Sequence, residues 1–596
     1  MTDWEEMDRY LKGESYRGFD CFGAHPAWEN GQTGARVNLY APNARQVQLV
    51  GTFNDWNGQP LTRLENGVWT GFAPGAQEGQ LYKYRIQTAD GSWYDRADPF
   101  AFASERRPQT ASILTRLDGY QWGDGEWMAR RDKNYNRPMS IYELHAGSWR
   151  RPDGDFPNYR ELARELVPYL KEQGFTHLEL LPLTEHPLDA SWGYQVSGYF
   201  SATSRYGSPH ALMGLVDACH QAGIGVILDF VPVHFVRDFH GLHLLDGSPL
   251  YESEDESLRY SQWDTALFDF TKPHVVSFLK SALNFWLGVY HFDGIRYDAV
   301  SNLIYRNGRR EEGENAPGQW FLRSANYGIQ QLHPNAMLIA EDSSDQIKVT
   351  APVVYGGLGF DYKWDLGWMH DTLDYLALPP QQRPARRDQF CFWEKYFSQN
   401  IYLLPFSHDE VVHGKGTLFG KMWGSREEKW AQLRCLMLYQ LTRPGKTLNF
   451  MGNELAQERE WSEERPLDWE LLEQEDHRAF SRYFARLQRL YRELPALWKE
   501  DYHPESFAWL EPKGGNPAVF AYRRSDRCGQ QVTVVLNLSG QAMPGLRVPV
   551  SGPESACLRL ATWEDASRPR LCPGPGGWEA QLSLPPFGGV LLGPEE

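Results

Sequence analysis

Several features that mark particular classes of protein are missing from this sequence of 596 residues. No stretch of about 18 consecutive apolar residues occurs, which argues against a membrane-spanning helix. The first residues, MTDWEEMDRYLKGESY, are acidic and contain no apolar run, so we expect no secretory signal. The seven cysteines are an odd number without a CxxC pair, which favours reduced thiols in a cytoplasm over a disulfide framework.

Basic residues are also fewer than acidic ones. Lys and Arg number 60 against 77 Asp and Glu, which gives a formal net charge of −17. Such an acidic chain is a poor partner for nucleic acid or for an anionic membrane. The sequence has no HExxH motif, no GxGxxG that opens a helix after a strand, no Walker loop and no GxSxG elbow. We therefore expect no cofactor, and a metal centre is a weak alternative.

Aromatic residues, in contrast, are abundant, at 14% of the chain with 23 Trp. Large apolar cores would account for them. Sugar binding would also account for them, because flat rings pack on the apolar faces of pyranoses. Composition alone leaves both explanations open.

The pattern of apolar residues divides the chain into three parts. From residue 20 to about 118, short alternating segments such as QVQLVGTF and LYKYRIQTADG are separated by Gly, Asn, Asp and Pro, which predicts a β-sandwich. Strand and helix patterns then alternate up to about residue 500, and short strands return after it. We predict an N-terminal β-sandwich domain over 1–118, a central domain of strands and helices over 119–503 and a C-terminal β-sandwich over 504–596.

Eight apolar segments of the central part read as strands, with helical patterns such as YRELARELVPYLKEQG between most of them. They are SIYELH, HLELLP, GVILDFVP, FDGIRYDAV, AMLIAED, FDYKWD, IYLLPFSHD and TLNFMGNE. Eight strands with intervening helices predict an α/β fold, a (β/α)8 TIM barrel.

The segment FDGIRYDAV places two charges inside an apolar strand. Arg296 and Asp298 are two residues apart, so their side chains share one face. Opposite charges on a buried face are costly unless they pair or take part in chemistry. A structural ion pair and a functional site are therefore both possible explanations of this segment alone.

Polar residues at the ends of other strands favour chemistry, because barrel active sites lie at the carboxyl ends of the strands. These residues are Asp229 and His234 after the third strand, Glu341 after the fifth, and His408 and Asp409 after the seventh. Retaining cleavage of a glycosidic bond needs an ionised nucleophile and a carboxylic acid about 5–5.5 Å apart. Arg296 favours the charged form of Asp298, and we expect burial and neighbouring carboxylates to protonate Glu341.

The same residues could contact the sugar. Asp409 could stabilise positive charge on the sugar ring in the transition state. His234 and His408 could donate hydrogen bonds to its hydroxyls.

These strand ends resemble the four sequence regions of the alpha-amylase superfamily, glycoside hydrolase family 13. The matching stretches are 229–234, 294–300, 340–343 and 407–409. The resemblance implies that Asp298 is the nucleophile, Glu341 the general acid and base, and Asp409 the stabiliser of the transition state. It also implies that Tyr194 stacks under the sugar, while Asp229, His234, Arg296 and His408 complete the pocket.

Within this superfamily, longer stretches resemble the branching enzymes, which form α-1,6 branches in glycogen. They include YELHAGSW, WGYQVSGYFSATSRYGSP, GGLGFDYKWDLGWMHDTLDY and LPFSHDEVVHGKGTL. The N-terminal domain, with GTFNDWNG, resembles a carbohydrate-binding module. The resemblance implies a transferase that acts on glycogen, amylose and maltooligosaccharides. We expect the protein to be a monomer in the cytoplasm. A hydrolase of the amylase or trehalohydrolase type and a non-catalytic glucan-binding protein are the alternatives.

A branching enzyme also needs a surface for the acceptor chain. Trp192, Tyr194, Trp364 and Trp368 are candidates for it, although the last two could equally be buried. Tyr297 stands where the superfamily commonly has a small aliphatic residue. We expect its ring to face the surrounding helices instead of the pocket.

Overall fold

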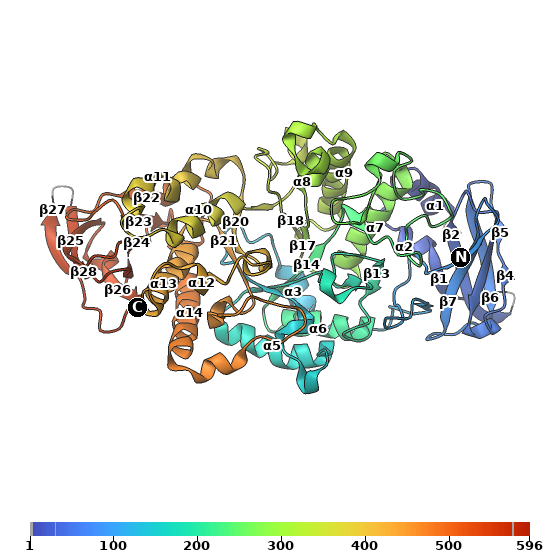
Figure 1. The fold of residues 1–596 in the computed structure, drawn as a ribbon, viewed down its shortest axis with the longest axis horizontal. Coiled ribbons are helices and arrows are strands. Elements are labelled where there is room, and N and C mark those ends of the chain that lie inside the picture. The colour runs from blue at the N-terminus through green and yellow to red at the C-terminus, as the bar shows by residue number, and fades with distance from the viewer. Residues whose placement is uncertain (1–3, 30, 575–576, 596) are drawn as a thin grey trace. The chain divides into compact units, whose positions relative to one another are not determined.

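The computed structural model describes residues 4–29, 31–574 and 577–595 (Figure 1). They form two compact units. The first comprises the chain up to residue 132 with residues 145–167 and 179–360, and the second comprises 133–144, 168–178 and the chain from 361 onward. None of the helices within the described residues is both long and apolar enough to cross a membrane.

A closed barrel of eight strands confirms the predicted (β/α)8 fold, and each predicted segment overlaps one of its strands. In barrel order they are β10 (Ser140–Leu144), β11 (His177–Leu180), β14 (Gly225–Phe230), β17 (Gly294–Tyr297), β18 (Met337–Ala340), β19 (Tyr362–Trp364), β20 (Tyr402–Phe406) and β21 (Lys446–Phe450).

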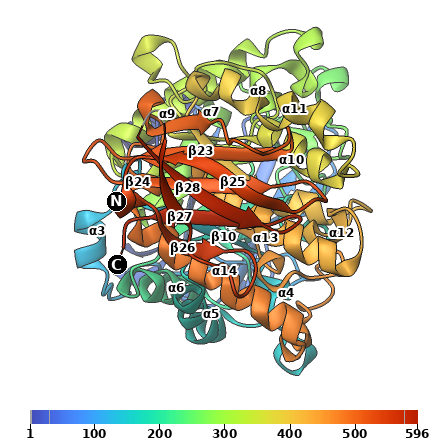
Figure 2. The ribbon, with the colours of Figure 1, turned by 90° about the vertical axis from the view of Figure 1, so that its left-hand side faces the viewer.

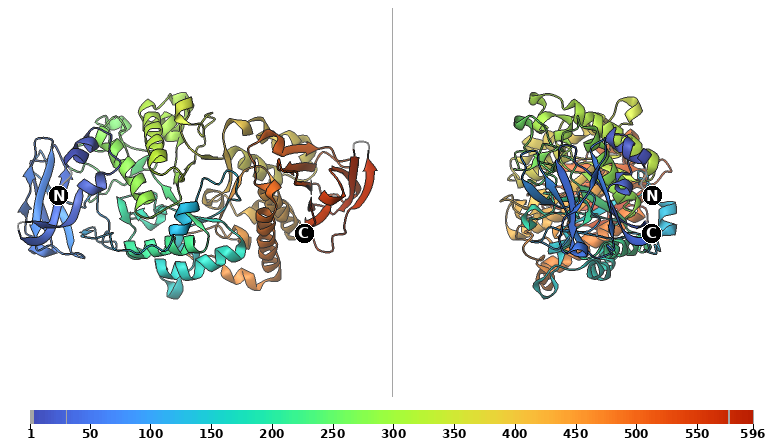
Figure 3. Two further views of the ribbon diagram at one scale, coloured as in Figure 1. Left: turned by 180° about the vertical axis from the view of Figure 1, so that it is seen from behind. Right: turned by 90° about the vertical axis from the view of Figure 1, so that its right-hand side faces the viewer.

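The first unit begins with a β-sandwich, as predicted (blue strands in Figure 3). One sheet has the order β1 (Gly23–Glu29), β2 (Gln32–Tyr40), β6 (Val68–Pro74), β5 (Thr62–Arg63); the other has β4 (Gln59–Pro60), β3 (Gln46–Gly51), β7 (Leu81–Gln87), β8 (Trp93–Arg96). Strand β7 shows why the segment folds this way. Its buried positions, Tyr82, Tyr84 and Ile86, alternate with more exposed ones, so one face of the sheet enters the core.

The helices of the first unit include α1 (Trp4–Leu11), α2 (Gly18–Cys21), α6 (Pro209–Gln221), α7 (Pro273–Gly288) and α9 (Ala316–Leu332). The Gly18 N–H donates to Ser281 Oγ on α7 at 2.9 Å, and the Arg96 guanidinium donates to the Leu244 carbonyl at 2.8 Å. Helix α6 begins where the Ser208 hydroxyl accepts the Ala211 N–H, with Pro209 in the first turn.

The second unit contains β19, β20, β21 and β10, which are consecutive parallel neighbours. Its main helices are α10 (Leu366–Ala377), α13 (Arg426–Thr442) and α14 (Glu475–Glu493). Helix α13 begins with a capping box, in which the side chains of Ser425 and Glu428 each accept a backbone N–H of the other residue.

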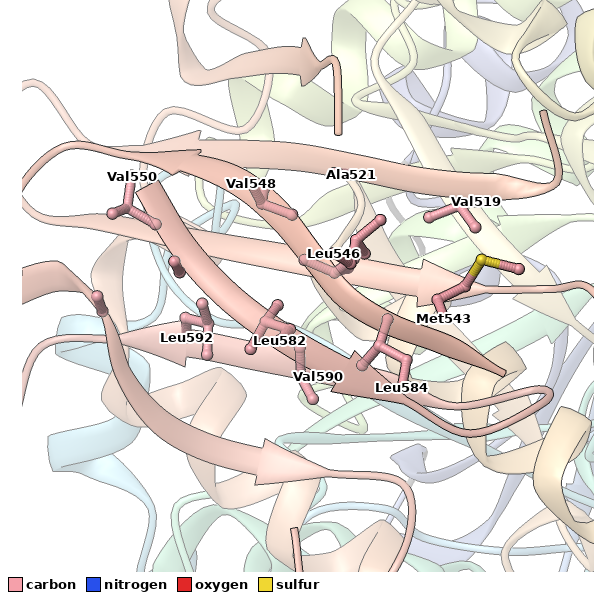
Figure 4. Close-up of a cluster of buried hydrophobic side chains, with 13 residues drawn as sticks. Val519, Ala521, Met543, Leu546, Val548, Val550, Leu582, Leu584, Val590 and Leu592 are labelled. Carbon is pink, nitrogen blue, oxygen red and sulfur yellow. The ribbon is translucent and has the colours of Figure 1, made fainter. Parts of the chain in front are cut away.

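A second β-sandwich, as predicted, is formed by strands between Phe507 and Gly593 (Figure 2). One sheet has the order β22 (Phe507–Leu510), β23 (Val519–Ser525), β24 (Gln531–Asn537), β29 (Gly589–Gly593), β26 (Cys557–Ala561); the other has β25 (Met543–Val550), β28 (Gly577–Leu584), β27 (Arg570–Gly574). Figure 4 shows the core between them, where Leu546 and Leu582 of one sheet lie among Val519, Val590 and Leu592 of the other.

Candidate active site

Three neighbouring strands of the first unit bring four of the predicted residues together. Strand β17 lies parallel to β14 on one side and to β18 on the other. The register aligns Asp229 of β14 directly with Arg296 of β17. Both side chains are 1% exposed, and Arg296 Nη1 donates to Asp229 Oδ1 at 2.8 Å and to Oδ2 at 2.9 Å. The strand register alone therefore builds a buried ion pair.

The same guanidinium reaches two further carboxylates. Arg296 Nη1 donates to Asp298 Oδ1 at 2.8 Å, and Nη2 lies 3.9 Å from Glu341 Oε2. Burial works against the charged guanidinium, but Asp229, Tyr194, Asp298 and Glu341 outweigh it and hold the pKa of Arg296 well above its ordinary value. Arg296 is thus a permanent cation that holds the nearby carboxylates around one point.

Asp298 and Glu341 lie immediately beyond the ends of their strands, and there the chain turns sharply. The Ala299 N–H donates to Glu341 Oε2 at 2.7 Å, with Ala299 in the left-handed region at φ 51°. A left-handed alanine costs about 1 kcal/mol, so the surrounding contacts must hold this turn. The side chains of Asp298 and Glu341 are 16% and 17% exposed, which leaves both carboxyl groups accessible to a ligand.

Tyr194 joins this group from a loop. It is half-buried, and its hydroxyl donates to Asp229 Oδ2 at 2.5 Å. The preceding Gly193 has φ 98°, and a Cβ at this position would lie 2.4 Å from the Pro182 carbonyl oxygen. Only glycine fits so close a backbone approach, which fixes the path of the loop.

His234 follows β14 and has a different environment. Its ring is buried, and burial lowers its pKa to about 4, so the imidazole is neutral near pH 7. Within the described residues, His234 Nδ1 has no hydrogen-bond partner. The ring lies 5.2 Å from that of Trp263, which is 41% exposed. A buried polar atom without a partner suits a ligand that supplies one.

His408 and Asp409 belong to the second unit, where they follow β20. His408 is 3% exposed, and its Nε2 lies 3.5 Å from Oδ1 of Asp409, whose side chain is 53% exposed. Glu143, at the end of β10, lies on the other side of this imidazole: Nδ1 donates to Glu143 Oε1 at 2.6 Å, and the backbone N–H of His408 donates to Oε2 at 2.8 Å.

The structure therefore joins five predicted residues in one network within the first unit: Tyr194, Asp229, Arg296, Asp298 and Glu341. It pairs His408 with Asp409 in the second unit. Sequence reasoning missed Glu143, although the charged end of the apolar segment SIYELH is the same signal that identified the other residues.

Two expectations about aromatic residues meet different outcomes. Trp364 and Trp368 are each only 1% exposed, so the suggestion that they form an acceptor surface is wrong. The Trp368 ring packs 5.3 Å from that of Phe406.

Tyr297 is buried with its ring 5.0 Å from that of Phe360 and 6.3 Å from that of Phe230, whereas Asp229 and Arg296 point to the other face. This agrees with the expected outward orientation of Tyr297.

Comparisons with known proteins give a consistent picture. The family model of carbohydrate-binding module 48 (isoamylase N-terminal domain) matches residues 21–101, and that of the alpha amylase catalytic domain matches residues 163–243. The 1,4-alpha-glucan branching enzyme GlgB of Bacillus caldolyticus is 46% identical over 99% of this chain and 92% of its own length. The GlgB of Geobacillus stearothermophilus is 44% identical over 99% of this chain and 96% of its own.

Solved structures show the same fold at lower identity. A pullulanase from Anoxybacillus sp. LM18-11, crystallised with maltotetraose, aligns with a TM-score of 0.76 at 17% identity over 100% of this chain and 89% of its own. A putative alpha amylase from Salmonella typhimurium aligns with a TM-score of 0.72 at 18% identity over 96% and 99%.

Proposed function

The chain belongs to the family of 1,4-alpha-glucan branching enzymes, and from this premise we propose that it forms α-1,6 branches by a retaining double displacement. An α-1,4 bond of a glucan is cleaved, the released donor segment stays bound as an ester, and a 6-hydroxyl of a glucan then accepts it. The observation that carries this proposal is the contact of one buried guanidinium with Asp298 at 2.8 Å and with Glu341 at 3.9 Å.

In the first step, Asp298 attacks the anomeric carbon while Glu341 donates its proton to the departing 4-oxygen. The hydrogen bond from Arg296 favours the ionised carboxylate that a nucleophile needs. The two carboxyl groups should be about 5–5.5 Å apart in the working enzyme, because no water stands between a retaining nucleophile and the sugar.

In the second step, Glu341 removes a proton from the 6-hydroxyl, and the resulting oxygen displaces Asp298 from the anomeric carbon. We assign Asp409 to stabilise the positive charge of the sugar ring in both transition states. His234 and His408 would hydrogen-bond its hydroxyls, and Tyr194 would stack beneath the ring. Two observations support these roles: Nδ1 of His234 has no hydrogen-bond partner in the part of the chain that the structure describes, and the carboxylate of Asp409 is half-exposed.

Hydrolysis is the competing function, because water could take the place of the 6-hydroxyl with the same residues. Purified protein should therefore be incubated with amylose while iodine absorbance, reducing ends and the anomeric proton of α-1,6 linkages are followed. We expect iodine colour to fall while α-1,6 linkages outnumber new reducing ends at least roughly tenfold, about 1.4 kcal/mol between the two acceptors. Reducing ends that rise as fast as chains are cut would make the protein a hydrolase instead.

A further inference from the structure

Glu143 is a buried carboxylate whose side-chain hydrogen bonds, within the described residues, all go to a single residue. It is 0% exposed and is the penultimate residue of strand β10, where its own carbonyl accepts the Met451 N–H at 2.9 Å. Its two carboxylate oxygens accept from the ring Nδ1 and from the backbone N–H of His408. A buried charge is costly to maintain, so a carboxylate that serves one histidine points to a role for that histidine.

The contact fixes which nitrogen of His408 carries a proton. A carboxylate can only accept, so the Nδ1 that lies 2.6 Å from Glu143 Oε1 must be the N–H. The other nitrogen, Nε2, is then the one that can exchange its role between acceptor and donor. It faces Asp409, whose Oδ1 lies 3.5 Å away. Because Glu143 also binds the backbone N–H, it holds both the main chain and the ring of this residue.

Another buried carboxylate of the same unit, Glu454, has a different set of partners. Glu454 is also 0% exposed, but it accepts from the hydroxyls of Tyr142 at 2.8 Å and Tyr169 at 2.6 Å and from the Gly452 N–H at 2.9 Å. Its partners come from three separate places in the chain, so it ties those segments together. The side chain of Glu143, by contrast, binds only His408 among the described residues.

We propose that Glu143 is a positioning residue for the glucan reaction, one that fixes the tautomer and orientation of His408 so that Nε2 is presented beside Asp409. The inference rests on the function proposed above, in which His408 and Asp409 contact the sugar. Glu143 itself touches no substrate. Its contribution passes through the imidazole, as the hydrogen-bonded carboxylate of a metal-binding histidine acts through that histidine.

Glu143→Gln is the sharpest variant. The amide keeps the size of the side chain but offers one acceptor where two donors converge. The imidazole can then rotate, or it can take the other tautomer and accept from the new NH2 group. We expect kcat/KM for amylose cleavage to fall about 10- to 100-fold, with an altered pH profile. The matched control, Glu454→Gln, should keep the pH profile of the wild type.

A double-mutant cycle with His408→Gln tests the coupling. If Glu143 acts through His408, adding Glu143→Gln to His408→Gln should reduce kcat/KM by less than twofold further. A full 10- to 100-fold further loss, or a Glu143→Gln variant with the activity and pH profile of the wild type, would overturn the proposal. Should Glu143→Gln fail to fold, Glu143→Asp, which keeps the charge but shortens the reach, carries the same cycle.

The same assay separates this inference from the proposed function. Wild-type protein that cuts amylose without making α-1,6 linkages would contradict transfer, yet the cycle on the cutting rate would still report whether Glu143 and His408 are coupled. Branching by the wild type with additive effects of the two substitutions would contradict only the role of Glu143.

Discussion

Tyr194 allows the contribution of a hydrogen bond to be separated from that of an aromatic ring. Its hydroxyl donates to Asp229 Oδ2 at 2.5 Å, while Asp229 keeps both of its contacts with Arg296, at 2.8 and 2.9 Å. Tyr194→Phe removes only the hydroxyl and leaves no carboxylate unpaired. Tyr194→Ala removes the ring as well, and with it the surface proposed to lie beneath the sugar.

The magnitudes follow from these contacts. A hydrogen bond to a charged group contributes about 1.5–3 kcal/mol, and the lower end applies because Asp229 retains its ion pair and Tyr194 is half-buried. We therefore expect Tyr194→Phe to lower kcat/KM for amylose about tenfold. Ring stacking adds about 0.5–1.5 kcal/mol beyond the area that the ring buries, so Tyr194→Ala should lose roughly a further tenfold or more.

Initial rates of amylose branching, measured with purified variants of equal circular dichroism, provide the comparison. If the Phe and Ala variants were equally impaired, the ring would contribute nothing, and the stacking role of Tyr194 would be wrong. If the Phe variant were fully active, the hydrogen bond to Asp229 would have no part in the reaction.

Three further predictions concern other parts of the chain. Asp298→Asn should keep the circular dichroism spectrum of the wild type but lower the branching rate roughly 1,000-fold or more, because an amide cannot form the glycosyl ester. Substantial turnover by a pure preparation of this variant would show that Asp298 is not the nucleophile. Burial works against the charged imidazole of His220, but hydrogen bonds to Asp293 and Asp124, each 2.9 Å long, outweigh it and raise the pKa of His220. The contribution of His220 to the stability of the fold should therefore be complete below about pH 6.5 and be lost as the pH rises through the higher folded-state pKa. Urea unfolding of the His220→Gln variant should lack this loss between neutral and alkaline pH, and an identical pH dependence in both proteins would contradict it. Asp501→Leu should destabilise the second unit by about 3–5 kcal/mol, because Lys446 and Arg524 would both be left as buried cations without their carboxylate. Lys446 lies 2.8 Å and Arg524 2.5 Å from Asp501. Urea unfolding measures the effect, and an unchanged unfolding midpoint would refute it.

The barrel strands could be found from the sequence because both of their faces are covered, so each reads as a short apolar segment between polar turns. The charged exceptions at their ends then indicated the site. Asp229 and Arg296 are the clearest example, since adjacent parallel strands place them side by side whatever the rest of the fold does.

Other features depend on tertiary contacts that no local pattern contains. The sequence around Trp364 and Trp368 does not show whether these side chains are buried or exposed. Trp368 is buried by its packing against Phe406 and against the Arg443 guanidinium, which lies 5.0 Å from its ring. The left-handed turn at Ala299 could not be foreseen, because alanine has no preference for that conformation. Glu143 was visible as a charged strand end, but its histidine partner lies 265 residues away in the sequence.

The claim that the transferred chain is held covalently on Asp298 can be tested most directly by trapping the ester. A Glu341→Gln variant incubated with a maltooligosaccharyl fluoride should still form the ester, because fluoride leaves without an acid, but should resolve it slowly without its base. Mass spectrometry of the intact protein and of its peptides should then find one glycosyl adduct on the peptide that contains Asp298. An adduct on any other residue, or turnover that inverts the anomeric configuration without an adduct, would contradict the account.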